Sequence, residues 1–294
     1  MKYYSEFMRS LKSSEFTISG EIDPPKDVNP DEVKEQVKHL KGTVVAANVT
    51  DNPIGDVIMN TLAPCVIMQD LGLEAIYQQT CRDRNRIALQ SDIIGATALG
   101  IKNVLALTGD HPKMGNHPQA KPVFDLDSVQ LTGMLRKMRE GSTLAGTELE
   151  NPPEFHIGVG ISPGVEPLEP EIIKLEKKVK AGAEFAQTQV IYDVKILERL
   201  KDEASHLDLP ILPGFAPLKS IGMAKFMIKY VPGIRIPEET MKKLEESKNR
   251  VETSIEIVAE LIAAARDMNF SGVHIMPVGM DIHVREMVER AGEI

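Results

Sequence analysis

The sequence predicts a closed (β/α)8 TIM barrel that forms a single domain over residues 1–294. Short apolar runs alternate with helical patterns along the whole chain, and strict alternation of this kind implies parallel strands. Eight strand–helix units are present, and no change in composition marks a linker. Eight units in a chain of this length favour a closed barrel. A Rossmann-like open sheet is the second choice, because no G-x-G-x-x-G follows a strand.

Each apolar run is bounded by turn residues, which predicts its limits as a strand. The expected strands are Phe16–Glu21, Val44–Val49, Glu74–Thr80, Val104–Leu107, Ile157–Ile161, Phe185–Val190, Ile211–Gly214 and Val273–Met276. Helical patterns are expected at about 31–41 (with Asn29 or Asp31 as the cap), 56–70, 85–99, 127–140, 169–181, 194–205, 251–268 and 281–290, with two more starting near Ser220 and Pro237. A short amphipathic helix within residues 1–14 opens the chain, with Phe7, Met8 and Leu11 on one side.

The composition is that of an ordinary globular protein, with 42% hydrophobic and 26% charged residues. The formal net charge of -9 argues against a nucleic-acid surface or a polybasic membrane contact. Two cysteines, Cys65 and Cys81, match no disulfide framework or zinc motif, so a reducing cytoplasm is the expected location. The N-terminal residues lack the apolar core of a signal peptide, and no apolar run reaches membrane-spanning length.

Polar residues gather where the strands end, and in TIM barrels the chemistry lies on the carboxyl ends of the strands. The run Asn103–His111 is the most informative, because a buried strand stops abruptly at Gly109 and Asp110. Taken alone, Asp110 is better explained by a turn or a helix cap than by function. The other strand ends contribute Glu21, Asn48, residues 50–52, residues 78–84, Thr108, Ser162, Gln187 and Gln189.

Several kinds of chemistry lack their residues at these positions. No His, Asp and Glu cluster has metal-ligand spacing, so we expect no metal site. His111 and His117 share a loop, for which solvent exposure is a better explanation than metal binding. No lysine stands at a strand end to form a Schiff base, and no G-x-S-x-G elbow offers a serine nucleophile.

Two carboxylates, Glu21 and Asp110, remain among neutral amides and hydroxyls. A glutamate buried in a cleft can have its pKa raised enough to act as a general acid near neutral pH. An ion pair between Glu21 and an arginine of residues 82–84 is an equally good explanation. The amide-rich lining suits a heteroaromatic ring that presents both donors and acceptors.

Two further segments carry candidate binding residues. The loop 110–127 is longer than a usual βα connection, and its Phe124 could stack on a planar ligand or pack the loop onto the barrel. The helix near 169–181 opens with acidic residues and then presents lysines. This basic face could meet a phosphate, although a solvated face is the commoner meaning of such a run. The residues concerned are Glu169, Glu171, Lys174, Lys177 and Lys178.

Six motifs resemble the methylenetetrahydrofolate reductase family, in the same order and over roughly residues 15–280. They are G-E-I-D-P-P-K at 20–26, T-C-R-D-R-N at 80–85, N-V-L-A-L-T-G-D at 103–110, F-D-L-D-S at 124–128, K-V-K-A-G-A at 178–183 and T-Q-V-I-Y-D at 188–193. The T-C-R-D-R-N form resembles the branch that is fused to a homocysteine methyltransferase domain or paired with an iron–sulfur partner subunit.

The resemblance implies a flavin enzyme that reduces 5,10-methylenetetrahydrofolate to 5-methyltetrahydrofolate. Glu21 matches the family's general acid, and Asp110 matches the aspartate between flavin and folate. Gln189 matches the glutamine that binds the pterin and the nicotinamide, and we group Gln187 with it as a substrate-binding residue. The flavin-contacting positions correspond to Asn48, Gln78, Leu107, Thr108, Gly109, Asp110, Phe124, Ser162, Glu171, Lys174, Lys177 and Lys178.

Some positions depart from the best-known bacterial members of the family. Gln78 and Ser162 replace histidines, Thr108 an arginine and Lys174 an asparagine. Ile221 stands where those members have an aromatic residue that stacks on nicotinamide or folate, and Met280 stands where they have an arginine that holds the folate tail. The departures leave the flavin open between FAD and FMN, and the electron donor open between NAD(P)H and an iron–sulfur or zinc partner subunit. A homo- or hetero-oligomer is expected.

Two other functions fit the same strand ends. A pterin-binding barrel could catalyse methyl transfer without flavin, and it would not need Glu21 as an acid. A subunit of a folate-enzyme complex could have lost its chemistry, although the intact Glu21, Asp110 and Gln189 speak against that.

Overall fold

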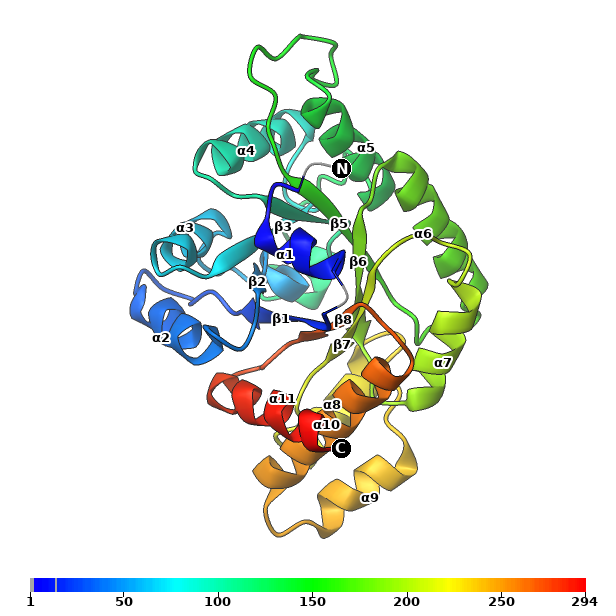
Figure 1. Ribbon diagram of the computed structural model, residues 1–294. Coiled ribbons are helices and arrows are strands. Elements are labelled where there is room, and N and C mark those ends of the chain that lie inside the picture. Colours follow the sequence, from blue (N-terminus) through cyan, green and yellow to red (C-terminus); the bar gives the residue numbers. More distant parts are fainter. Residues whose placement is uncertain (1–2, 14) are drawn as a thin grey trace.

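The computed structural model describes residues 3–13 and 15–294, and it forms a closed barrel of eight parallel strands (Figure 1). Each strand pairs with the next in parallel, and β8 pairs with β1. The barrel prediction is therefore confirmed, and the open sheet is wrong. The strands are β1 Thr17–Ile22, β2 Ala46–Val49, β3 Glu74–Thr80, β4 Asn103–Leu107, β5 His156–Ile161, β6 Phe185–Val190, β7 Ile211–Phe215 and β8 Gly272–Ile275.

The helices surround the barrel, and their apolar side chains form one hydrophobic core with the outer side chains of the strands (Figure 1). Local caps fix several starts: Asn85 accepts the backbone N–H groups of Ile87 and Ala88, and Asp127 forms a capping box with Gln130. The helices are α2 Asp31–Leu40, α3 Leu62–Asp70, α4 Arg86–Ala98, α5 Ser128–Arg139, α6 Glu169–Ala181, α7 Val194–Glu203, α8 Ile221–Tyr230, α9 Glu238–Glu246, α10 Arg250–Asp267 and α11 Val284–Glu293.

Two expected helix starts are wrong. The helix expected from residue 56 begins at Leu62, because Asp56 is engaged by other parts of the chain: its carboxylate binds Lys26 at 3.1 Å and accepts the N–H of Asn116 at 2.9 Å. The last helix begins at Val284, because residues 281–283 form a separate 3-10 turn. Two other 3-10 turns, η1 Pro53–Gly55 and η2 Pro112–Met114, lie in the loops after β2 and β4.

The opening helix α1, Glu6–Leu11, lies across the amino-terminal end of the barrel (Figure 1). Glu74 at the start of β3 accepts the backbone N–H groups of Glu6 and Phe7. Phe7, Met8 and Leu11 are buried, so the predicted apolar side is confirmed. Residues 1–2 and 14 of the expected helix lie outside the described residues.

Apolar side chains fill the barrel between α1 and its carboxyl end. Phe7 meets Phe185 edge-on, with ring centroids 5.1 Å apart. Phe185 occupies the centre because β5 has glycine there: a Cβ on Gly158 would lie 2.2 Å from the ring. Ala46, Ile76, Leu105 and Leu212 complete this layer. A closed core therefore forms the floor beneath the carboxyl ends of the strands.

Candidate active site

A cavity of about 420 Å³ opens above this floor, at the carboxyl ends of the strands. Most of the residues expected to bind substrate or cofactor line it, so the barrel brings together side chains from five strands and from α6. Those that line it are Glu21, Asn48, Gln78, Leu107, Thr108, Gly109, Asp110, Ser162, Glu171, Lys174, Lys178, Gln187 and Gln189.

Two expected cofactor-binding residues lie elsewhere. Lys177 is exposed on α6 and is not part of the cavity wall. Phe124 is half-buried and packs against the outer hydrophobic core, and its backbone N–H donates to the carbonyl of Cys81 at 3.1 Å. Of the two explanations for Phe124, this arrangement is the one in which it packs the loop onto the barrel.

Glu21 stands on the cavity wall with its side chain 16% exposed. Its Oε2 accepts a hydrogen bond from Gln78 Nε2 at 3.2 Å and lies 3.6 Å from His274 Nε2. The expected alternative, an ion pair with residues 82–84, is wrong, because Arg82 pairs with Asp83 and Arg84 pairs with Asp51. The Glu21 carboxyl group therefore has an amide and a histidine as its neighbours, and it faces the cavity, where a ligand can reach it.

An amide pair lies at the base of the cavity. Asn48 Nδ2 donates to Gln187 Oε1 at 2.7 Å, and Gln187 Nε2 donates back to Asn48 Oδ1 at 3.1 Å. Gln187 Nε2 also lies within 3.3 Å of Ser19 Oγ. Gln189 lies two residues after Gln187 on β6, so strand alternation turns it to the same side, and it also lines the cavity.

Asp110 stands on the cavity rim and is exposed. It follows Gly109, whose φ of +88° favours glycine and turns the chain sharply out of β4. Its Oδ2 accepts the backbone N–H of Ile54 at 3.3 Å, from the loop after β2. Asp110 therefore bridges two loops and does not end a simple turn.

The opposite wall is cationic. Lys178 is 4% exposed, and its Nζ donates to the carbonyl of Gly160 at 2.6 Å. Burial, with a smaller contribution from Lys174, lowers the pKa of Lys178 to about 8. Lys174 lies 4.0 Å from Glu171, whose carboxylate accepts the N–H of Ser162. Burial thus disfavours the charged form of Lys178, and an anionic ligand bound beside the ammonium group would stabilise that form.

Sequence reasoning missed His274, which is buried beside Glu21 and binds Ser19 Oγ through Nδ1 at 3.1 Å. The alternation of β8 was a usable signal, since His274 and Met276 both line the cavity. The sequence pattern assigns no role to Asp51, and it offers Arg82 only as a candidate ion-pair partner of Glu21. Both line the cavity, and both are nearly fully buried.

The described residues contain no group of three or more His, Cys, Asp or Glu side chains that could hold a metal ion. His111 is exposed, and its Nδ1 accepts the N–H of Lys113 within its own turn. In the same ranges, 3–13 and 15–294, no helix has the length and apolar character needed to cross a membrane.

Comparison with known proteins agrees with this geometry. The sequence profile described as methylenetetrahydrofolate reductase matches residues 6–292. The chain belongs to the methylenetetrahydrofolate reductase family. The resemblance of the six motifs is thereby confirmed at the level of the family.

Relatives with this name are identical to the chain at about a quarter of the aligned residues. The 5,10-methylenetetrahydrofolate reductase of Salmonella typhimurium is 28% identical over 64% of this chain and 58% of its own length. Methylenetetrahydrofolate reductase 1 of Schizosaccharomyces pombe is 26% identical over 77% of this chain and 37% of its own length. The chain thus spans little more than half of the first relative and less than half of the second.

Solved structures share the fold. An uncharacterized protein from Clostridium thermocellum, described as binding two copies of 5-methyl-5,6,7,8-tetrahydrofolic acid, superposes with a TM-score of 0.63 at 15% identity, covering 97% of this chain and 96% of that protein. A 2,3-dimethylmalate lyase superposes with a TM-score of 0.56 at 11% identity, covering 98% and 86%. Identities this low support the barrel alone.

Proposed function

We propose that this protein reduces 5,10-methylenetetrahydrofolate to 5-methyltetrahydrofolate with a bound flavin. The observation that carries the proposal is a single cavity with three chemically different parts. They are the carboxyl groups of Glu21 and Asp110, the amide side chains at the bottom, and the cationic side formed by Lys174 and Lys178. Membership of the methylenetetrahydrofolate reductase family supports it.

The cavity residues fit a flavin. The pyrimidine edge of its ring presents both donors and acceptors, as do the amides of Asn48, Gln78 and Gln187. Its phosphate needs a cation, which Lys178 supplies with Lys174 beside it. When bound, the flavin supplies the hydride for the reaction. FMN and FAD both carry a phosphate that these lysines can hold.

Glu21 is the proposed general acid. It protonates the ring nitrogen of the folate, and this proton assists opening of the five-membered ring to the reactive iminium ion. Gln78 holds the carboxyl group at Oε2, and His274 packs beside the same oxygen. Asp110 on the rim and Gln189 on β6 orient the pterin ring, with Gln187 beneath them.

We further propose that a partner protein, such as an iron–sulfur subunit, delivers the electrons. Neither Ile221 nor Met280, which stand where relatives place a stacking aromatic and a folate-binding arginine, lines the cavity. Met280 is 5% exposed and packs into the core. The flavin-loaded chain alone should then not oxidise NADH or NADPH. Oxidation of either nucleotide by the pure chain would instead make NAD(P)H the direct donor.

An anaerobic assay tests the proposed reaction. The protein is loaded with FMN or FAD, the flavin is reduced with dithionite, and methylenetetrahydrofolate is added. The flavin absorbance should return as an equal amount of 5-methyltetrahydrofolate forms. Absorbance that stays bleached, with no methyl product, would overturn the proposal.

A further inference from the structure

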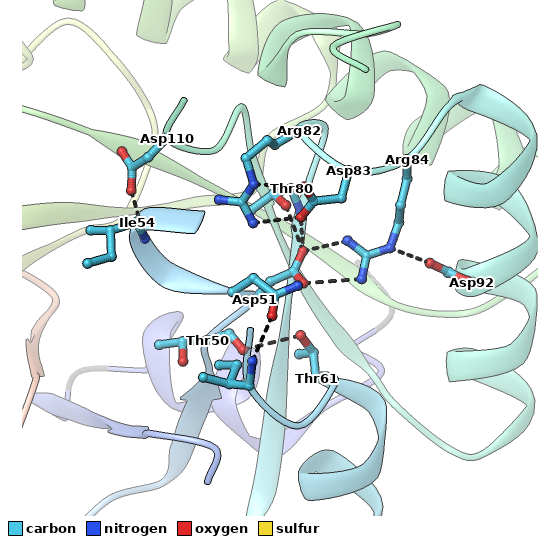
Figure 2. A network of polar contacts seen from close by, with 12 residues as sticks. Thr50, Asp51, Ile54, Thr61, Thr80, Arg82, Asp83, Arg84, Asp92 and Asp110 are labelled. Carbon is cyan, nitrogen blue, oxygen red and sulfur yellow. Dashed lines mark hydrogen bonds and ion pairs between the residues drawn. The ribbon is translucent and has the colours of Figure 1, made fainter. Parts of the chain in front are cut away.

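We propose that Asp51 is a positioning residue for Asp110, acting through Arg84 and the segment 80–84. The proposal rests on the proposed function of Asp110, but its structural part can be tested without turnover. Asp51 follows β2, while Asp110 follows β4, so the two are held in register by the β3 loop that lies between them (Figure 2).

Asp51 is 4% exposed. Its carboxylate accepts four hydrogen bonds, two from Thr80 at the end of β3 and two from Arg84 in the loop that follows. Its Oδ2 accepts the backbone N–H of Thr80 at 2.8 Å and the Thr80 hydroxyl at 2.8 Å. Both terminal nitrogens of Arg84 donate to it, at 2.8 and 3.1 Å (Figure 2). A two-pronged pair between a guanidinium and a carboxylate fixes direction as well as distance.

Arg84 extends the contact to the helix ring, because its Nε lies 2.8 Å from Asp92 of α4 (Figure 2). The loop after β2, the loop after β3 and α4 are therefore tied to one guanidinium. Replacing a buried ion pair by apolar residues is often neutral for stability, so such a pair is weak evidence of a purely stabilising role. Because Asp51 itself lines the cavity, we explain the Asp51–Arg84 pair by the position that it gives to residues 80–84.

The held segment is the surface on which the Asp110 loop begins. A Cβ on Gly109 would lie 3.0 Å from Thr80 Cβ and 3.1 Å from Arg82 Cβ, so this backbone packs directly on the β3 loop. The N–H of Cys81 lies 3.2 Å from the carbonyls of both Leu107 and Thr108. A shift of residues 80–82 would therefore move Gly109 and the adjacent Asp110.

The same segment also holds the returning end of that loop. The N–H of Val123 donates to the carbonyl of Arg82 at 2.7 Å, and the N–H of Phe124 donates to that of Cys81 at 3.1 Å. On the other side, Ile54 lies three residues after Asp51 and donates its N–H to Asp110. Asp51 therefore fixes both segments that position Asp110, namely residues 80–84 and the loop that contains Ile54.

Hydrogen–deuterium exchange of the ligand-free protein tests this coupling. Asp51→Asn keeps the shape but loses the charge that holds Arg84, and the amides of residues 108–124, including Val123 and Phe124, should exchange about tenfold faster. Arg84→Gln should give the same change, and it replaces Asp51→Asn if that variant does not fold. Asp92→Asn is the matched control, because it removes the other partner of Arg84 and leaves Thr80 untouched. Unchanged exchange in both test variants, or equal acceleration in Asp92→Asn, would overturn the coupling.

A mutant cycle tests the functional part. If Asp51 acts through Asp110, Asp51→Asn lowers kcat about tenfold in the wild-type background and has little further effect in Asp110→Asn. Equal losses in both backgrounds would overturn the positioning role. If no variant and no wild-type protein reduces the folate, the proposed function fails, while the exchange result still decides whether Asp51 holds the loop.

Discussion

His274 Nε2 lies 3.6 Å from Glu21 Oε2, across the seam where β8 closes onto β1. The two residues are 253 positions apart in the sequence, and only closure of the barrel brings them together. His274 is fixed from behind, because its Nδ1 lies 3.1 Å from Ser19 Oγ. We infer that the imidazole sets the orientation of the proposed acid.

This orientation can be tested with two amide substitutions. His274→Asn keeps a nitrogen near Ser19 but cannot reach Glu21, and misplacement of a catalytic group by about 1 Å can lower the rate about a hundredfold. His274→Gln places a nitrogen near the position of Nε2 and should restore most of kcat. The measurement is kcat for folate reduction together with the Kd for FMN. Equal activity of the two variants would contradict the orienting role.

Replacing the acid itself should separate the two half-reactions. Glu21→Gln keeps the hydrogen-bonding shape but has no proton to give, so reoxidation of the reduced flavin by methylenetetrahydrofolate should slow about a hundredfold or more. Flavin affinity should change little, because Lys174 and Lys178 lie on the other wall. Stopped-flow absorbance measures the rate. A rate close to that of the wild type would contradict the role of Glu21 as the general acid.

Lys178 should make phosphate binding depend on pH. Its pKa is lowered to about 8 in the ligand-free protein, so the side chain is protonated and positively charged below that pH. It loses the proton, and with it the charge, as the pH rises above 8. The affinity for FMN should therefore fall above pH 8, by at most about tenfold per pH unit. Riboflavin, which lacks the phosphate, should not show this decline, and neither should Lys178→Met. Lys180→Met, on the exposed side of α6, should behave like the wild type.

The same lowered pKa makes the stability of the ligand-free protein rise with pH, whereas the affinity for FMN falls. The unfolded chain binds the Lys178 proton more tightly, with a pKa near its usual 10.5, so this group lowers stability fully below pH 8. That cost declines as the pH rises from about 8 to 10.5. Urea unfolding of the wild type and of Lys178→Met should therefore differ most at neutral pH and converge at the upper end of this range.

The closed end of the barrel contributes stability without chemistry. Phe7 is fully buried against Phe185, so Phe7→Ala should lower the free energy of unfolding by about 3–5 kcal/mol. Phe226→Ala is the control, because Phe226 is 55% exposed on α8. Flavin affinity of the folded Phe7→Ala protein should be retained. Loss of that affinity at a temperature where the variant is folded would show that α1 also shapes the cavity.

Much of the fold was predictable because the evidence for it is local. Strands β3 and β6 have the predicted limits, and the starts of α8 and α9 follow Ser220 and Pro237 as expected. The start of α3 was not predictable, because Asp56 is drawn away from a helix by Lys26 and Asn116, from loops far along the chain. Contacts of that kind leave no periodic signal in the sequence.

The candidate site was predictable where alternation decides it. Glu21, Asn48, Gln78 and Gln187 follow from the inward face of each strand. The partners of these residues do not follow from the sequence, since a pattern cannot say which arginine meets which carboxylate. The pairing of Arg84 with Asp51, and the absence of an arginine at Glu21, required the assembled barrel.

Hydride transfer from a reduced flavin to the methylene carbon of the folate should leave an isotope label in the product. The flavin-loaded protein is reduced in D₂O, where the N5 proton of reduced flavin exchanges with solvent, and one equivalent of methylenetetrahydrofolate is added under anaerobic conditions. Mass spectrometry then measures deuterium in the methyl group of the product. We expect 5-methyltetrahydrofolate with one deuterium in that group. A product without deuterium, or no methyl product, would contradict hydride transfer from the flavin.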